Sequence, residues 1–336
     1  MIIKSVAYPR AGLVGNPSDG YHGKTISFTF SNFHATVLIY ETPELEILSN
    51  SRDESKFESI EDLAADVRLN GYYGGIRLLK ATIKVFHDYC RATGVQLDER
   101  NFTLRYETDI PSRVGLAGSS AIITACLRAL MRFYGLRIPK PVQANLILSV
   151  ENRELDIPAG LQDRVAQVYQ GLVYMDFERE YMRSHGYGRY RYLPVENLPP
   201  LYIAYRDEMS EGTEVFHNDI RGRYNRAETD VVNAMLFWGD LTDRVSEAIQ
   251  SGQNHEEVGP LLNSNFDKRK EIYQISQGNL EMVDAARSVG ASAKFCGSGG
   301  AIVGTYKDEA MYEELSRLLS SLNISLLKPR FVEPMK

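Results

Sequence analysis

Hydrophobic and polar residues repeat along the chain with two periods, and each period predicts a different kind of element. Apolar and polar side chains alternate over residues 25–30, 35–40 and 102–107, which predicts strands, and we expect the first two to pair antiparallel. Apolar positions recur every three or four residues over 76–93, which predicts an amphipathic helix. The continuous apolar run of residues 121–134 predicts a buried helix.

Strands and helices also alternate in the second half of the chain, after the prolines Pro194, Pro199 and Pro200. These prolines predict a boundary between a first domain, residues 1–194, and a second domain, residues 195–336. The order strand, helix, strand predicts an α+β sandwich with helices on one face of a sheet. Further strands are predicted over residues 2–8, 172–177, 201–205, 291–295, 301–306 and 324–327, helical regions over 139–151, 214–251, 255–287 and 308–322, and a surface loop over 43–62.

The composition limits the class of protein. The 336 residues, 43% hydrophobic and 24% charged, have the balance of a globular protein of about two domains. A net charge of −6 offers no basic surplus for nucleic acid, and no apolar run reaches the roughly 18 residues of a membrane span. Cys90, Cys126 and Cys296 form no CxxC pair and predict reduced thiols. We therefore expect a cytoplasmic monomer or homodimer with no nucleic-acid or membrane partner.

A loop rich in glycine and serine, residues 111–120, comes directly before the long apolar run. Gly115 and Gly118 let the backbone turn sharply and approach a ligand closely. Ser119 and Ser120 occupy the position of a helix N-cap, where free N–H groups and the positive end of the helix dipole suit a phosphate. A glycine-bearing turn that only begins a core helix explains the same residues, so both interpretations stay open.

Two carboxylates, Glu151 and Asp163, flank a turn that contains Pro158 and Gly160. Phosphoryl transfer needs such a pair. One carboxylate holds Mg²⁺ together with a serine hydroxyl, and the other lies beside the attacking hydroxyl group. Asp163 equally suits the first turn of a helix, where the dipole favours an acidic residue without any catalytic role.

Two further loops carry residues that suit a ligand. Short polar groups in the turn-rich residues 9–21 can bind sugar hydroxyls, although an Asx turn that bonds only its own backbone gives the same pattern. The glycines of residues 297–300 permit close approach of a ligand, or form a flexible hairpin loop. The polar residues of the first loop are Arg10, Asn16, Ser18 and Asp19.

Residue types and spacing disfavour other chemistries. The six histidines share no ligand spacing, so no zinc site is expected, and the GxxxxGKS/T loop of P-loop kinases is missing. Residues 187–192 interleave tyrosine with arginine, as single-stranded nucleic-acid sites do. One short patch in an acidic chain fits a solvated strand or loop better.

Together the three loops resemble the motifs of the GHMP kinases, the superfamily of galactokinase, homoserine kinase, mevalonate kinase and phosphomevalonate kinase. Residues 111–121 resemble the P-x-x-x-G-L-G-S-S-A motif, with Ala117 as a small departure. Residues 9–21 resemble the first motif, with Arg10 at its basic position, and residues 294–300 resemble the third.

Two longer stretches, residues 14–28 and 160–176, are most similar to the glucuronokinases of plants, and Asn16-Pro17 replaces the Glu-His of galactokinases. The resemblance implies an ATP- and Mg²⁺-dependent kinase that phosphorylates the anomeric hydroxyl of D-glucuronic acid and gives glucuronate 1-phosphate. A uronic acid carboxylate requires an arginine or a cluster of N–H donors. The candidate arginines are Arg206, Arg221 and Arg223.

The resemblance also implies a fold and a role for each motif. The first domain is expected to be ribosomal protein S5 domain 2-like and the second ferredoxin-like. Ser120 and Glu151 would hold Mg²⁺, and Asp163 would face the sugar hydroxyl beside Arg10, which stays protonated. The implied ATP-binding residues are Pro111, Gly115, Leu116, Ala117, Gly118, Ser119, Ser120, Ala121, Gly297 and Ser298. The implied substrate residues are Arg10, Asn16, Ser18, Asp19, Tyr21, Asp163, Gly297 and Gly299.

Other functions on the same fold stay open. Another GHMP kinase would act on galactose, arabinose, a heptose phosphate or mevalonate. A sugar sensor without activity would be expected to lack Asp163 or Glu151, and the chain has both. An interaction protein without a ligand would have no need of three glycine-bearing loops.

Overall fold

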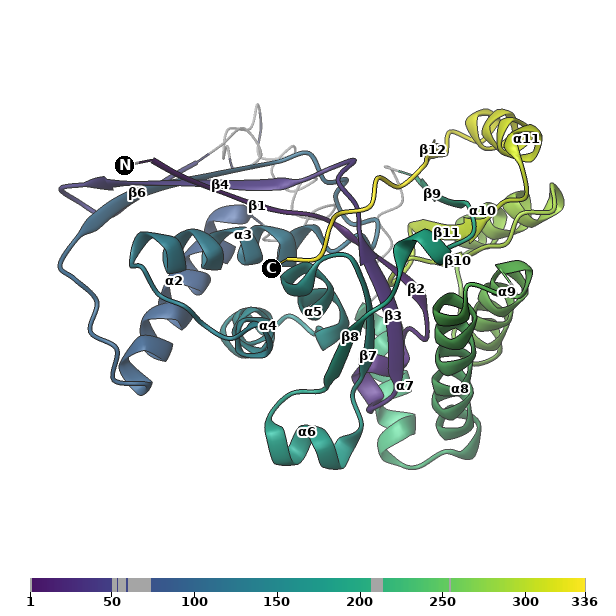
Figure 1. Ribbon diagram of the computed structural model, residues 1–336, viewed down its shortest axis with the longest axis horizontal. Coiled ribbons are helices and arrows are strands. Elements are labelled where there is room, and N and C mark those ends of the chain that lie inside the picture. The colour runs from purple at the N-terminus through teal and green to yellow at the C-terminus, as the bar shows by residue number, and fades with distance from the viewer. Residues whose placement is uncertain are drawn as a thin grey trace. The chain divides into compact units, whose positions relative to one another are not determined.

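The computed structural model describes residues 2–49, 53, 59, 74–206, 214–253 and 255–335, with the backbone alone for 214–219. Strands and helices combine in an α+β fold, which confirms the predicted fold class (Figure 1). The chain divides into two compact units. The first comprises Met1–Tyr8, Phe33–Ile110 and Gly118–Ala159, and the second Pro9–Asn32, Pro111–Ala117 and Gly160–Lys336.

The first unit is built on a four-stranded sheet of order β1-β4-β6-β5, in which only β5 and β6 run parallel. Helix α3 (Gly118–Phe133) packs against β1 and β4, and α2 (Gly75–Ala92) and α4 (Lys140–Ser149) pack against α3. Residues 120–130 of α3 are all buried, which explains the continuous apolar run in its sequence. The strands are β1 (Ile2–Ala7), β4 (Ala35–Thr42), β5 (Glu46–Leu48) and β6 (Asn101–Thr108).

The second unit contains two four-stranded antiparallel sheets, of order β2-β3-β7-β8 and β10-β11-β9-β12. The arginine- and tyrosine-rich residues 187–192 supply β8, an edge strand. The first of these sheets comprises β2 (Arg10–Val14), β3 (Lys24–Thr29), β7 (Leu172–Asp176) and β8 (Arg189–Tyr192). The other comprises β9 (Leu201–Tyr205), β10 (Lys294–Phe295), β11 (Ala301–Thr305) and β12 (Ser325–Leu327).

Helices of the second unit pack on the sheet that contains β9. Phe266, Met282 and Leu315 from three helices share one hydrophobic core with Tyr202 and Ile302 of the strands, as the predicted sandwich requires. The helices of the unit are α5 (Leu161–Tyr169), α6 (Arg179–His185), α7 (Glu214–Asn225), α8 (Thr229–Ser251), α9 (His255–Ile272), α10 (Gln277–Ser288) and α11 (Glu309–Ser321).

The predicted pairing of residues 25–30 with 35–40 is wrong. Strand β3 lies between β2 and β7 in the second unit, whereas β4 lies between β1 and β6 in the first. The turn-rich composition of residues 9–21 hid the strand β2, which is the antiparallel partner of β3. The glycine and proline residues indicated the turn that follows this strand. They also disfavoured a strand prediction for the residues directly before the turn.

Two other predicted segments are divided in the structure. The helical region 214–251 is two helices, separated near Ala227, whose φ of 55° cannot continue a helix. Within the predicted loop 43–62, residues 46–48 form β5. Most of the remainder of that loop lies outside the described residues.

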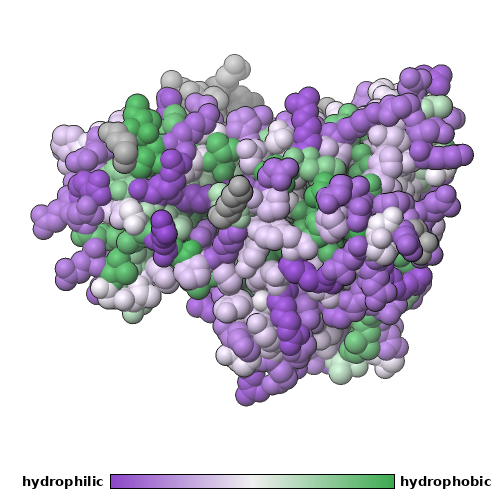
Figure 2. Space-filling model, viewed as in Figure 1, coloured by the Kyte–Doolittle hydropathy of each residue, from purple (hydrophilic) through white to green (hydrophobic). Residues whose placement is uncertain are grey.

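Among the described residues, the large hydrophobic side chains that are exposed are Ile2, Leu45, Tyr192 and Leu236. On the face seen in Figure 2, hydrophobic residues form separate patches among hydrophilic ones. Of the helices in the described ranges, none combines the length and the hydropathy that crossing a membrane requires.

Candidate active site

Two glycine-bearing loops that are far apart in the sequence touch through their backbones in the second unit. A Cβ on Gly297 would lie 2.5 Å from the Gly115 oxygen, and a Cβ on Gly115 would lie 2.7 Å from the Gly299 oxygen. A Cβ on Gly300 would lie 2.9 Å from the Val114 Cα. Gly115 also has a φ of 70°, which favours glycine. Residues 113–117 and 296–300 therefore need glycine in order to pack against each other.

Arg10, the first residue of β2, ties these two loops to helix α5. Its Nε donates to Asp163 Oδ1 at 2.6 Å, and its Nη1 donates to the carbonyl oxygens of Gly115 at 2.8 Å and Cys296 at 3.1 Å. The Arg10 side chain is 5% exposed. A buried guanidinium requires such a full set of acceptors, and three segments of the chain supply them.

Asp163 lies in the first turn of α5 and faces two arginines. Its Oδ2 lies 3.3 Å from Nη1 of Arg164, in addition to the bond between its Oδ1 and Arg10. Burial opposes ionisation of this carboxyl, but the charges of Arg10 and Arg164 outweigh burial and hold the pKa of Asp163 below its usual value. Asp163 is thus a stable anion.

Asp19, in the short 3-10 helix Ser18–Tyr21, approaches the same turn of α5. Its Oδ2 accepts a hydrogen bond from the backbone N–H of Gln162 at 3.3 Å. Gly160 makes this approach possible, because a Cβ there would lie 2.2 Å from Oδ2. Burial, followed by the charge of Asp163, raises the pKa of Asp19 to about 6. Neighbouring carboxylates thus have pKa values shifted in opposite directions.

Asn16 and Ser18 are engaged within the protein. Asn16 is 3% exposed, and its Oδ1 accepts from Lys294 Nζ at 2.5 Å. Ser18 is fully buried, and its Oγ donates to the Lys24 oxygen at 3.0 Å. Asn265 also holds the loop by accepting from Gly15 N–H at 2.7 Å. These bonds give the loop that carries Asp19 a defined conformation.

Lys294 is a buried residue of this region that the sequence placed within the third motif without a role. It is 1% exposed, and its Nζ donates to Gly12 O and Asn16 Oδ1, both at 2.5 Å. Burial lowers the pKa of Lys294 well below its ordinary value. The only signal in the sequence was a lysine inside an apolar strand.

The residues expected to bind ATP belong to both units. Helix α3 begins at Gly118, so Ser119 and Ser120 lie within its first turn, and their predicted N-cap position is wrong by two and three residues. Glu151 lies in a π-helical segment, Val150–Glu154, directly after α4. Pro111, Gly115, Leu116 and Ala117 belong to the second unit, whereas Gly118, Ser119, Ser120, Ala121 and Glu151 belong to the first.

The three candidate arginines have different surroundings. Arg206 pairs with Glu281, and Arg223 pairs with Glu228 and Asp230. Arg221 is exposed, and no carboxylate of the described residues pairs with it.

Arg221 instead lies against the loop that carries Asp19. Its Nη1 donates to the Gly20 oxygen at 2.7 Å, and its guanidinium carbon lies 4.3 Å from the centre of the buried Tyr21 ring. The structure thus brings one of the three arginines beside the predicted sugar loop.

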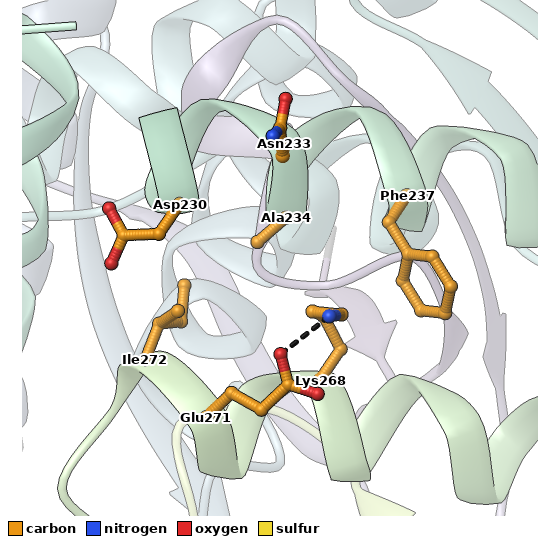
Figure 3. A pocket seen from close by; sticks show the side chains of 7 residues that line it. All are labelled: Asp230, Asn233, Ala234, Phe237, Lys268, Glu271 and Ile272. Atoms are coloured by element: carbon orange, nitrogen blue, oxygen red, sulfur yellow. Dashed lines mark hydrogen bonds and ion pairs between the residues drawn. The ribbon is translucent and has the colours of Figure 1, made fainter. Parts of the chain in front are cut away.

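A cavity of about 420 Å³ lies between α8 and α9 and contains none of the predicted site residues (Figure 3). Its charged groups are neutralised locally, since Lys268 Nζ lies 2.5 Å from Glu271 Oε2 and Asp230 pairs with Arg223. The lining residues are Asp230, Asn233, Ala234, Phe237, Lys268, Glu271 and Ile272.

Comparison with known proteins shows which class of protein this chain is similar to. The family model for the GHMP kinases N terminal domain matches residues 77–171. The galactokinase of Lactococcus lactis, solved in complex with galactose, has a similar fold. It superposes with a TM-score of 0.76 at 16% identity, over 100% of this chain and 95% of that one. The matched domain and the fold are thus those that GHMP kinases share.

Two curated relatives narrow the class. The chain is 43% identical to the probable glucuronokinase 2 of Arabidopsis thaliana, over 88% of this chain and 82% of that protein. It is 42% identical to glucuronokinase 1 of the same plant, over 90% of this chain and 84% of that protein. The chain belongs to the glucuronokinase family of GHMP kinases.

Proposed function

We propose that this chain is a phosphotransferase that moves the γ-phosphoryl group of ATP to the anomeric hydroxyl of D-glucuronate. The products are ADP and glucuronate 1-phosphate. The names of the relatives support D-glucuronate as the substrate. One structural observation supports the location of the active site. Arg10 joins the second and third loops to Asp163, directly beside the loop of Asp19.

The phosphates of ATP are assigned to residues 115–120 together with Gly297 and Ser298. Helix α3 begins within the first of these segments, so the positive end of its dipole favours an anion there. In this assignment residues 1–194 supply the phosphate loop and the carboxylates, and residues 195–336 supply the third motif.

Ser120 and Glu151 are assigned to Mg²⁺. Both offer hard oxygen donors, which Mg²⁺ prefers, and both are buried, at 1% and 3% exposure. In the described part of the chain no three His, Cys, Asp or Glu side chains cluster as a metal site. Mg²⁺ usually keeps several waters and takes further ligands from substrate phosphates. Bound Mg²⁺ would neutralise negative charge on the phosphoryl group.

Arg10 and Asp163 form the reactive centre of this proposal. Arg10 stays protonated and cannot act as a base, so its role is to fix Asp163 and to stabilise charge on the transferring group. Asp163 is the acidic residue that orients the sugar hydroxyl. Most of the rate in phosphoryl transfer comes from such placement and from charge neutralisation.

Arg221 is assigned to the uronate carboxylate. Its contacts with Gly20 and Tyr21 hold it at the sugar loop, whereas Arg206 and Arg223 already pair with carboxylates. A guanidinium that pairs with no carboxylate of the described chain is available to one from a substrate.

A substrate panel tests this function. ADP release would be measured with glucuronate, galactose, arabinose, a heptose phosphate and mevalonate. We expect turnover of glucuronate in preference to the others. Turnover of galactose or mevalonate with none of glucuronate would reject the substrate, and no turnover of any compound would favour a sugar sensor.

A further inference from the structure

Arg269, on α9, is a buried cation beneath the third glycine loop, residues 296–300. It is 3% exposed, and none of the ion pairs of the described residues includes it. Its Nη1 donates to the Gly297 oxygen at 2.9 Å, and its Nη2 donates to the Ser298 oxygen at 3.2 Å. Its Nε has no hydrogen-bond partner within the described ranges. Because a buried charge ordinarily requires an opposite charge, Arg269 indicates an anion that comes from outside the chain.

Other cations near this loop add to its positive charge. Arg10 donates to the first carbonyl oxygen of the loop at 3.1 Å, and Lys294 lies in the strand directly before it. Burial, and then the charges of Arg269 and Arg10, lower the pKa of Lys294 well below its usual value. Asp163 pairs with Arg10, whereas Asp19 acts on Arg269 without forming an ion pair, and burial lowers the pKa of Arg269. An anionic ligand at the loop would offset this positive charge.

The third glycine loop also has two backbone donors that a ligand can use. In the part of the chain that the structure describes, the N–H groups of Ser298 and Gly299 have no hydrogen-bond acceptor, whereas Gly300 N–H donates to Asn279 Oδ1 at 2.9 Å. A Cβ on Gly115 would lie 3.2 Å from the Ser298 nitrogen and 3.4 Å from the Gly299 nitrogen. Glycine at position 115 therefore leaves both nitrogens uncovered.

Each carbonyl group that Arg269 binds belongs to the same peptide group as one of these donors. The Gly297 carbonyl shares its peptide with the Ser298 N–H, and the Ser298 carbonyl shares its peptide with the Gly299 N–H. A cation at a carbonyl oxygen draws electron density through the conjugated peptide, and hydrogen bonds linked in this way strengthen one another. Both N–H groups thus become stronger donors to an anion.

We propose that Arg269 is a positioning residue that aligns and polarises these two peptide groups, so that the N–H groups of Ser298 and Gly299 bind a phosphate of ATP. The inference rests on the proposed function, which assigns the nucleotide phosphates to this loop. Arg269 touches no phosphate itself. Its effect should therefore depend on the charge of the nucleotide, which a purely structural role would not require.

Calorimetric titration of the full-length protein with adenosine, MgADP and MgATP tests this charge dependence. Arg269→Gln removes the positive charge and should weaken MgATP binding by about 10–100-fold, with the affinity for adenosine unchanged. Arg269→Lys keeps the charge and should recover most of the affinity for MgATP. The matched control is Arg287→Gln, because Arg287 donates to the Ala293 oxygen at 3.1 Å but pairs with Asp267. This control should bind MgATP as the wild type does.

An equal loss of affinity for adenosine and MgATP in Arg269→Gln, or no loss of either, would overturn the inference. A wild-type measurement makes the test independent of variants that fail to fold. On addition of MgATP to ¹⁵N-labelled protein, the amide protons of Ser298 and Gly299 should move downfield, and that of Gly300 should move little. Unchanged Ser298 and Gly299 signals would refute the inference. A wild type that binds MgATP but does not phosphorylate glucuronate would instead reject the proposed substrate.

Discussion

The second unit contains a hollow region and a charged region, and they differ in what they can do. The cavity between α8 and α9 has a volume of about 420 Å³, but its charges are paired locally at an accessible surface (Figure 3). The cluster around Arg10 instead buries two arginines, each 5% exposed, beside two carboxylates with opposite pKa shifts. Surface ion pairs contribute little, whereas buried charges strongly alter acid–base behaviour.

In this protein, buried charged residues indicate the candidate active site better than a cavity does. Perturbed acids near a set of convergent loops are typical of active sites. The cluster has two such acids, Asp19 and Asp163. The acids that line the cavity instead pair with Arg223 and Lys268. Variants in the two regions should therefore have very different effects on turnover.

The largest expected effect comes from Asp163→Asn. Turnover of glucuronate should fall by about 10²–10³-fold, because the sugar hydroxyl loses the carboxylate that orients it and Arg10 loses its partner, while MgATP still binds. The matched control is Asp230→Asn in the cavity, which should keep activity close to wild type. Steady-state kinetics of both variants would contradict the comparison if Asp230→Asn lost as much activity as Asp163→Asn.

Arg221→Met should raise the KM for glucuronate by about 10–100-fold with little change in kcat, as expected for loss of a charge-assisted hydrogen bond. Arg223→Met is the control on the same helix, since Arg223 pairs with Glu228. Equal KM values for the two variants would remove Arg221 from carboxylate recognition.

Glu151→Gln should raise the Mg²⁺ concentration needed for half-maximal turnover by about tenfold or more, since even partners beyond the metal ligands have effects of that size. Glu154→Gln lies in the same π-helical segment, and Glu154 pairs with Lys84. It should leave the Mg²⁺ titration unchanged. An unaltered titration in Glu151→Gln would count against the metal assignment.

The smallest effects concern stability. Gly297→Ala should destabilise the fold by about 1–3 kcal/mol, because its Cβ would lie 2.5 Å from the Gly115 oxygen and 2.9 Å from Arg10 Nη2. Gly239→Ala, in α8, meets nothing within 4 Å and should stabilise by about 0.5–1 kcal/mol. Urea unfolding measures both, and the same sign for the two variants would be inconsistent with this packing.

Local patterns predicted the elements whose formation depends on their own residues. The helix 76–93 and the strand 102–107 have clear periodicity, and the structure has α2 and β6 there within one residue at each end. Strand pairing could not be predicted in this way. Strand β3 pairs with β2 and β7, and these pairings depend on contacts between distant residues that periodicity does not indicate. The β2 strand itself was obscured by the glycine and proline of its neighbouring turn.

The candidate active site, too, could be predicted from the sequence only in part. The motifs named Arg10, Asp19 and Asp163 together, but only burial and distance distinguish the two carboxylates. Equally, nothing in the sequence separates Arg221 from Arg206 and Arg223, because their ion pairs are formed by distant residues or by turns. Arg269 and Lys294 were overlooked in the same way, since an arginine and a lysine become informative only when buried.

The most direct test of the account is ³¹P NMR of a reaction with glucuronate and MgATP. The account predicts ADP together with a sugar phosphate whose phosphorus couples to the anomeric proton, and neither product with Asp163→Asn on the same timescale. A phosphate at another carbon of the sugar, or equal product formation by Asp163→Asn, would contradict it.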